Sequence, residues 1–278
     1  MFRKLISLLL VLCIPLFPYV CAEDTAQEMS LLVLSVGKAD CMLLRSGGDI
    51  YMIDTGKSKR WPSVYDTLIR EGVTHLTGVI LTHTDTDHAG GLKKLIESGI
   101  AADHVYASPY YNKKESKHPA VRALRKTDMS IEWLAAGTVL PLGEGSLTVL
   151  GPLSHNTAEE NCNSLVLLAE AAGGSILLTG DMEFPEEAEL LGAGMIPHAD
   201  VLKVANHGEA DATSEAFIHA VTPSVAVIST DTSEEPDTPA PRVLRLLNAR
   251  NIRVLQTQQS AAGVRVVIRD GQILADNE

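Results

Sequence analysis

Four potential metal ligands stand within six residues of one another, directly after an apolar run. The segment His83-Thr-Asp85-Thr-Asp87-His88 follows the run from Thr77 to Thr82. Imidazole and carboxylate groups suit zinc, manganese and iron. The structural alternative is that one aspartate or threonine caps the next helix and the histidines lie on the surface. Capping needs only one such residue, so the HxDxDH spacing predicts a metal site if other ligands converge on it.

Three further polar residues follow apolar runs elsewhere in the chain. Asp54 follows Ile53, Asp181 follows Thr179-Gly180, and His207 follows the run that begins at Val201. Each alone is typical of a turn. Together with the 83–88 segment they place candidate ligands at four strand ends, where α/β folds bind their ligands.

The elements that would position these residues alternate between strands and helices. There is no internal repeat and no linker, and the segment from Thr232 to Pro241 is predicted to be a loop. This alternation predicts an α/β protein with helix-covered sheets and a single mature domain over residues 23–278. We predict strands at 31–36, 42–44, 50–53, 77–82, 147–150, 164–168, 176–179, 201–204, 225–229, 264–268 and 272–274, and helices at 64–70, 92–96, 186–191, 214–220 and 242–249.

The motifs and their order resemble the extracytoplasmic hydrolase domain of the ComEC competence protein family, from about residue 31 to residue 273. The resemblance implies a four-layer αββα metallo-β-lactamase sandwich, two divalent metal ions (Mn²⁺ or Zn²⁺) and phosphodiester hydrolysis, with single-stranded DNA as a candidate substrate. Asp85, in place of a middle histidine, points to this branch rather than to β-lactam hydrolases. The motifs are Val36-Gly37-x-x-Asp40, Ile53-Asp54-Thr55-Gly56, His83-x-Asp85-x-Asp87-His88-x-Gly90-Gly91, Asn161-x-Asn163-Ser164-Leu165-Val166, Thr179-Gly180-Asp181 and Lys203-Val204…His207-Gly208.

The resemblance also implies a role for each matching residue. Asp87, His88 and His207 would hold one metal ion, and Asp181 would bridge it to a second. The second ion would be held by His83, with Asp85 and Asn163 as weaker donors. Asp87 and Asp181 would take part in catalysis through the water between the ions. Asp54 and Asp40 would orient the ligands from behind.

Several positions depart from the family pattern. Ala39 stands where a glycine is common, Asn206 replaces the first of two histidines, and Glu209 and Thr238 replace a serine and a histidine. The metal ligands are largely kept, while groups that would hold phosphate or protonate a leaving group are not. The substrate is therefore less defined than the metal site, and a loss of catalysis stays open.

Two groups of basic residues are candidates for binding a polyanion. One follows the Asp54 strand, and the other lies beside Tyr110 and Tyr111, whose rings would stack on bases. The alternative for the second group is a solvated surface with acids interleaved. The candidate residues are Lys57, Lys59, Arg60, Lys113 and Lys114.

The composition and the first residues of the sequence indicate which binding partners and which cellular location to expect. The formal net charge of −12 argues against non-specific binding to duplex DNA. Residues 1–22 resemble a signal peptide, with Arg3 and Lys4 before an apolar run and Val20-Cys21-Ala22 before Glu23. We therefore expect a secreted or extracytoplasmic protein without a stable membrane span after processing, or a membrane-anchored one if residues 1–22 are kept. Cys41 and Cys162 would then either pair or act as buried small hydrophobic residues.

These observations leave three functions in order of preference. The first is an exported metal-dependent phosphodiesterase or nuclease. The second is a hydrolase of another extracellular phosphoester, such as a cell-wall polymer, because a fold does not fix its substrate. The third is a catalytically silent module that keeps a metal for structure. The oligomeric state is not indicated by the sequence.

Overall fold

The computed structural model describes residues 27–278, which form two packed sheets with helices on both outer faces. The signal peptide predicted at residues 1–22 lies outside the described residues. Within the described part, none of the helices combines the length and the apolar character needed to cross a membrane.

The first sheet has eight strands in the order β15-β14-β1-β2-β3-β4-β5-β6. Its β15-to-β3 half is antiparallel, and its β3-to-β6 half is parallel. The C-terminal hairpin thus pairs with the N-terminal strand of the sheet. The strands are β1 (Glu28–Leu34), β2 (Cys41–Ser46), β3 (Asp49–Thr55), β4 (His75–Leu81), β5 (Ala101–Ala107), β6 (Ile131–Trp133), β14 (Gly263–Arg269) and β15 (Gln272–Asn277).

The second sheet has seven strands in the order β13-β12-β11-β10-β9-β8-β7. Strands β10 to β13 are parallel and β7 to β10 antiparallel, so this sheet also has one half of each kind. The strands are β7 (Val139–Leu142), β8 (Gly145–Gly151), β9 (Val166–Ala171), β10 (Gly174–Leu178), β11 (Val201–Lys203), β12 (Val225–Ile228) and β13 (Arg253–Gln256).

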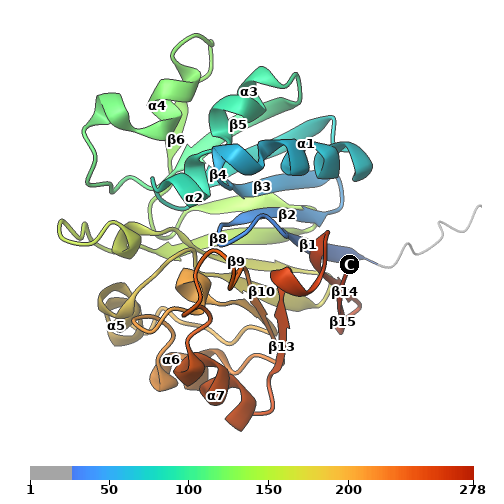
Figure 1. Cartoon of the computed structure of the whole chain (residues 1–278), viewed down its shortest axis with the longest axis vertical. Helices are drawn as coiled ribbons and strands as arrows, with labels where there is room; N and C mark the ends of the chain where they lie inside the picture. Colours follow the sequence, from blue (N-terminus) through green and yellow to red (C-terminus); the bar gives the residue numbers. More distant parts are fainter. Residues whose placement is uncertain (1–26) are drawn as a thin grey trace, which may run out of the picture.

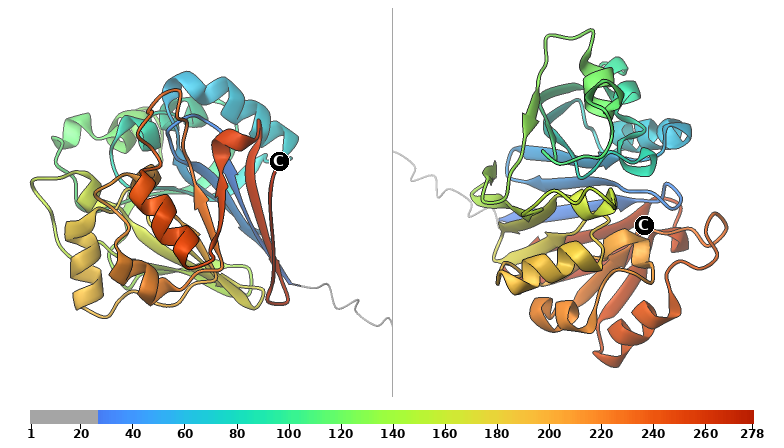
Figure 2. Two further views of the ribbon diagram at one scale, coloured as in Figure 1. Left: turned by 60° about the horizontal axis from the view of Figure 1, so that its bottom comes forward. Right: turned by 90° about the vertical axis from the view of Figure 1, so that its left-hand side faces the viewer.

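Helices cover the outer face of each sheet and complete four layers (Figures 1 and 2). The first sheet is covered by α1 (Trp61–Arg70), α3 (Leu92–Glu97) and α4 (Pro119–Leu124), and the second by α5 (Phe184–Gly192), α6 (Glu215–Val221) and α7 (Pro241–Ala249). A short helix, α2 (Thr86–Ala89), follows β4. Single 3₁₀ turns lie at η1 (Ser58–Arg60), η2 (Glu115–Lys117), η3 (Asn161–Asn163), η4 (Ala205–Gly208) and η5 (Thr257–Gln259).

Strand β1 shows why an unbroken apolar run forms a strand here. Met29, Leu31 and Val33 point into the core between the sheets, while Leu32 and Leu34 pack under the helices of the first sheet. A strand buried on both faces needs apolar residues at every position. The predicted αββα fold class is therefore confirmed.

The cysteine pairing raised from the sequence is wrong. Cys41 and Cys162 are both free and buried. Cys41 lies in the core beneath the first-sheet helices, whereas the Cys162 thiol donates to Glu183 Oε2 at 3.8 Å. Burial raises the pKa of both thiols, that of Cys162 to about 11, so both thiols stay protonated. The two cysteines therefore act as small buried hydrophobic residues, which is the second of the two possibilities that the sequence left open.

Candidate metal centre

The candidate ligands are brought together by the parallel halves of both sheets. Asp54 is the penultimate residue of β3, and His83 follows β4. Helix α2, which comes next, carries Asp87 and His88. From the second sheet, Asp181 follows β10 and His207 lies in η4 directly after β11. The ends of parallel strands from the two sheets thus supply one shared site.

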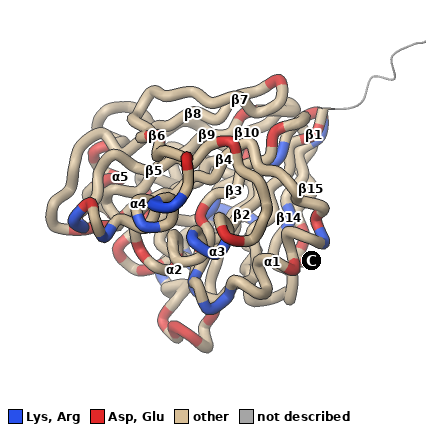
Figure 3. The backbone as a smooth tube through the Cα atoms, turned by 90° about the horizontal axis from the view of Figure 1, so that it is seen from above, with Lys and Arg blue, Asp and Glu red and all other residues tan. Residues whose placement is uncertain are grey.

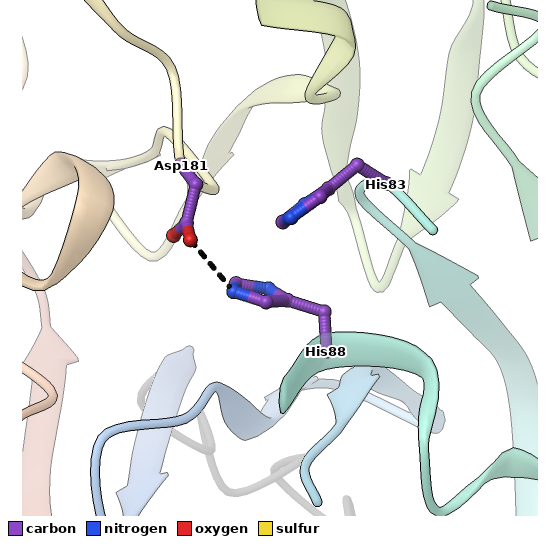
Figure 4. Close-up of side chains that lie close together, drawn as sticks. All are labelled: His83, His88 and Asp181. Atoms are coloured by element: carbon purple, nitrogen blue, oxygen red, sulfur yellow. Dashed lines mark ion pairs between the residues drawn. The ribbon is translucent and has the colours of Figure 1, made fainter. Parts of the chain in front are cut away.

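Three imidazole nitrogens face the Asp181 carboxylate. His88 Nε2 lies 3.0 Å and His207 Nε2 lies 3.4 Å from Asp181 Oδ2, and His83 points toward the same place (Figure 4). Asp87 Oδ2 lies 3.9 Å from His207 Nε2. Within residues 27–278, three sets of potential ligand atoms lie within 4.8 Å of one another. They are His83-His88-Asp181, Asp87-His88-His207 and, behind the His88 ring, Asp40-Asp54-His88.

These side chains are buried and incompletely bonded. The Nε2 atoms of His83, His88 and His207 and Asp181 Oδ1 are all buried without a hydrogen-bond partner. A buried polar atom without a partner costs about 1–3 kcal/mol. Four such atoms in adjoining ligand groups fit divalent cations, which would satisfy them with nitrogen and oxygen ligands.

Residues behind the cluster fix the orientation of two of the imidazole rings. Asp54 accepts from His88 Nδ1 at 2.7 Å and from the Thr82 amide at 2.8 Å. His207 Nδ1 donates to the Ser229 carbonyl at 2.8 Å. These bonds keep one ring proton on Nδ1 of each ring, so the Nε2 lone pair of the neutral imidazole would be available to bind a metal ion. Asp54 therefore lies behind the His88 ring, and its role in orienting that ring stays a prediction.

Opposite charges dominate the electrostatics of the cluster. Burial disfavours a charge on His88, but Asp181 and Asp54 on either side raise its pKa well above the ordinary value. Burial also opposes ionisation of Asp181, yet His207 and His88 hold its pKa well below the usual range. Burial and the His88 charge lower the pKa of His83. Oppositely charged side chains thus stabilise each other in a buried setting at His88 and Asp181.

The backbone is strained at the same place. Asp54, Asn206 and His207 have φ values of 56°, 44° and 52°, in the left-handed region that residues other than glycine seldom adopt. Each costs about 1–3 kcal/mol and persists only where surrounding contacts enforce it. Two of these residues carry side chains of the cluster, which links the strain to the site.

Two weaker ligands proposed from the sequence are engaged elsewhere. The Asn163 amide donates to the carbonyls of Asn156 and Glu159, and its oxygen accepts from the Asn156 amide at 2.9 Å. Asp85 is half-exposed and binds Lys113 at 2.8 Å, with its second oxygen 3.9 Å from His83 Nε2. Asn163 thus holds the 156–163 loop, and its role as a ligand stays a prediction. Asp85 lies at the rim of the cluster.

The substitution Asn163→Ala is therefore expected to lower stability by about 2–3 kcal/mol, because it leaves buried backbone groups of the loop unpaired. Metal content should stay at the parental level. Thermal unfolding and metal analysis after dialysis measure the two effects, with the exposed Asn112→Ala as a control. Loss of a metal ion at parental stability would instead make Asn163 a ligand.

The basic residues proposed for substrate binding are mostly paired with acids. Lys113 binds Asp85 and the Thr84 carbonyl, and Lys114 is exposed. Lys57, Lys59 and Arg60 all contact Glu234. Although partial burial would raise the pKa of Glu234, hydrogen bonds from these three cations lower it to about 2. In the view of Figure 3, basic and acidic positions are interspersed rather than separated by sign.

Sequence reasoning gave no role to several supporting residues. Lys203 is fully buried and its ammonium lies 2.8 Å from Asp40, which also accepts from Ser229 Oγ. Asp40 Oδ1 in turn lies 3.7 Å from His207 Nδ1. A lysine inside the apolar run VLKVA was the available signal, because a fully buried lysine needs a partner. Ser164 Oγ accepts from the Asp181 amide at 3.1 Å and lies 3.4 Å from His83 Nδ1.

Comparison with known proteins agrees with this geometry. Residues 34–232 match the family model of the metallo-β-lactamase superfamily. The chain therefore belongs to this superfamily, whose members are metal-dependent hydrolases.

Its relatives confirm the resemblance to the ComEC family. The chain is 31% identical over 244 residues to ComE operon protein 3 of Bacillus subtilis (strain 168), covering 85% of this chain and 31% of the relative. It is 26% identical over 237 residues to competence protein ComA of Neisseria gonorrhoeae, covering 84% of this chain and 32% of the relative. The chain thus spans about a third of the length of these curated relatives.

A solved structure shares the fold. The metallo-β-lactamase fold protein YhfI from Bacillus subtilis aligns with a TM-score of 0.54 and 11% identity, over 82% of this chain and 95% of YhfI. At this identity the likeness shows the architecture alone.

Proposed function

We propose that this protein is an exported metal-dependent phosphodiesterase. The observation that carries the proposal is the set of three buried, unpartnered Nε2 atoms around Asp181. Membership of a superfamily of metal-dependent hydrolases and relatives named as competence proteins support the substrate class. The charged and apolar start of the sequence supports export.

The two metal positions are unequal in their protein ligands. Asp87, His88, His207 and Asp181 would hold one ion with two imidazoles and two carboxylates. His83 and Asp181 would hold the other, with Asp85 at the rim as its remaining nearby carboxylate. We infer one tightly held ion and one exchangeable ion, the latter suited to manganese because oxygen donors would complete its coordination.

When bound, divalent ions lower the pKa of water and stabilise charge on phosphoryl oxygens. The protein itself would orient the metal-binding side chains and provide the buried setting. Asp54 and the Ser229 carbonyl hold the protons on Nδ1 of His88 and His207, so both rings present their lone pairs. The buried setting excludes bulk water and strengthens electrostatic interactions within the site.

A substrate panel tests the proposal. The protein is expected to hydrolyse bis(p-nitrophenyl) phosphate, with activity rising on added Mn²⁺ and lost with EDTA. Comparison of single-stranded DNA with a phosphate monoester tests the diester preference. Because most basic groups are paired and the net charge is −12, a cell-wall phosphoester polymer belongs in the same panel. A protein that binds metal but turns over none of these substrates would be the silent module.

A further inference from the structure

Three cationic side chains converge on a single carboxylate beside the metal centre. Lys57 Nζ lies 2.7 Å from Glu234 Oε2, and Arg60 Nη2 and Lys59 Nζ lie 2.8 and 3.1 Å from Oε1. The cations come from the segment after β3, whereas Glu234 comes from the loop between β12 and α7. Asp231 contributes a weaker contact, 3.9 Å from Arg60. The cluster therefore keeps an excess of positive charge.

The carboxylate does not use all the donors that surround it. Arg60 Nε is buried and has no hydrogen-bond partner. A carboxylate offers two oxygens, whereas a phosphodiester offers four, two of which share the negative charge. The planar guanidinium donates two parallel bonds to phosphate when its geometry is satisfied. The hydrogen-bond donors of the three cations would thus be satisfied more completely by a phosphate group than by the Glu234 carboxylate.

Backbone contacts tie this basic segment to the metal centre. The Gly56 carbonyl accepts from the Gly91 amide at 2.9 Å, and the Gly56 amide donates to the Asp40 carbonyl at 2.8 Å. Thr55 Oγ1 donates to the His88 carbonyl at 2.9 Å. Lys57 is three residues from Asp54, so their Cα atoms are at most about 11 Å apart. A strand bound at the metal centre can reach the basic cluster through a neighbouring phosphate.

Glycine leaves room for the acid. A Cβ atom added at Gly37, whose φ is 87°, would lie only 2.8 Å from Glu234 Oε2. The β1–β2 loop therefore accommodates the Glu234 carboxylate only because it has no side chain at this position. The Glu234 carboxylate lies between the β1–β2 loop and the basic segment, in contact with both.

We propose that Lys57, Lys59 and Arg60 form a phosphate-binding subsite that Glu234 occupies as an internal anion. A phosphate of a single-stranded nucleic acid displaces Glu234 when the strand binds. The proposal rests on the proposed phosphodiesterase function for its ligand class. It predicts that the strand and Glu234 compete for the same cations, so Glu234 lowers the affinity of the protein for the strand.

The test measures binding of a fluorescently labelled oligothymidylate to the full chain by anisotropy, with EDTA present to prevent turnover. Glu234→Gln removes the charge at nearly constant size and is expected to bind about tenfold more tightly than the parent. Glu235→Gln is the matched control, because Glu235 is the exposed neighbour, lies in no ion pair within residues 27–278 and carries the same charge. It should stay within about twofold of the parent.

Two further measurements locate the effect. The double variant Glu234→Gln/Arg60→Gln should lose the tighter binding of the oligothymidylate that Glu234→Gln shows. Inorganic phosphate should compete with the oligothymidylate only at a much higher concentration. Unchanged affinity in Glu234→Gln, or an equal gain in Glu235→Gln, would overturn the proposal, as would inorganic phosphate competing as well as the strand. Hydrolysis is measured separately: tighter binding without turnover rejects the phosphodiesterase function, whereas turnover with unchanged binding rejects only the subsite.

Discussion

Asp181→Asn is expected to lose the tightly held metal ion and to lower hydrolysis of bis(p-nitrophenyl) phosphate by about a thousandfold or more. Asp181 Oδ2 lies 3.0 Å from His88 Nε2 and 3.4 Å from His207 Nε2. It is also the group that both proposed metal positions share. The amide keeps the size of the side chain but removes the negative charge that holds the cations. Equilibrium dialysis with metal analysis and steady-state turnover measure the two effects.

Two variants show whether such a loss is specific. Asp85→Asn changes a carboxylate at the rim of the cluster and should keep the tight ion, because Asp85 is paired with Lys113. His75→Ala removes an exposed histidine whose partner is Asp103, and should leave metal content and turnover unchanged. If Asp181→Asn retained a full metal complement, or if Asp85→Asn lost the tight ion, our assignment of the ligands would be wrong.

The fold was predictable where strands are buried on both faces. The runs that gave β1, β4, β10, β11 and β12 are apolar almost throughout, so their type was clear from the sequence. The strands that were missed are β5, β6, β7 and β13. Three of these lie at sheet edges and β5 lies next to an edge. An edge strand is covered less completely and needs fewer apolar side chains, as the exposed positions of β6 and β13 show.

Long-range partners explain what the sequence could not reveal about the site. The strand-end positions predicted that His83, His88, Asp181 and His207 would meet, because parallel strands deliver their carboxyl ends to one edge. The pairing of Arg60 with Glu234, 174 residues later, had no local signal. The same holds for Asn163, whose resemblance to a ligand position gave no indication that its amide would hold the 156–163 loop.

Lys203 is the supporting residue with the largest expected effect on stability. Its ammonium donates to the Val204 carbonyl at 3.0 Å and lies 2.8 Å from Asp40, and neither charged side chain has any solvent exposure. Burial disfavours the ionised form of Asp40, but the charges of Lys203 and His207 outweigh this effect and lower its pKa. Asp40 therefore stays ionised in the interior, with the Lys203 ammonium beside it. Removing one partner would leave the other charge buried alone.

Lys203→Met is expected to destabilise the fold by about 3–5 kcal/mol, the usual cost of breaking a buried ion pair by removing one partner. Adding Asp40→Asn should recover at least about half of the loss, because no unpaired charge is then left. Urea unfolding followed by circular dichroism, with EDTA present so that metal binding does not contribute, measures both. Lys93→Met, which breaks only an exposed pair with Glu97, is the control and should change stability by about 0.5 kcal/mol at most. A Lys203→Met protein as stable as the parent, or a double variant less stable than Lys203→Met alone, would show that Asp40 does not depend on the Lys203 charge.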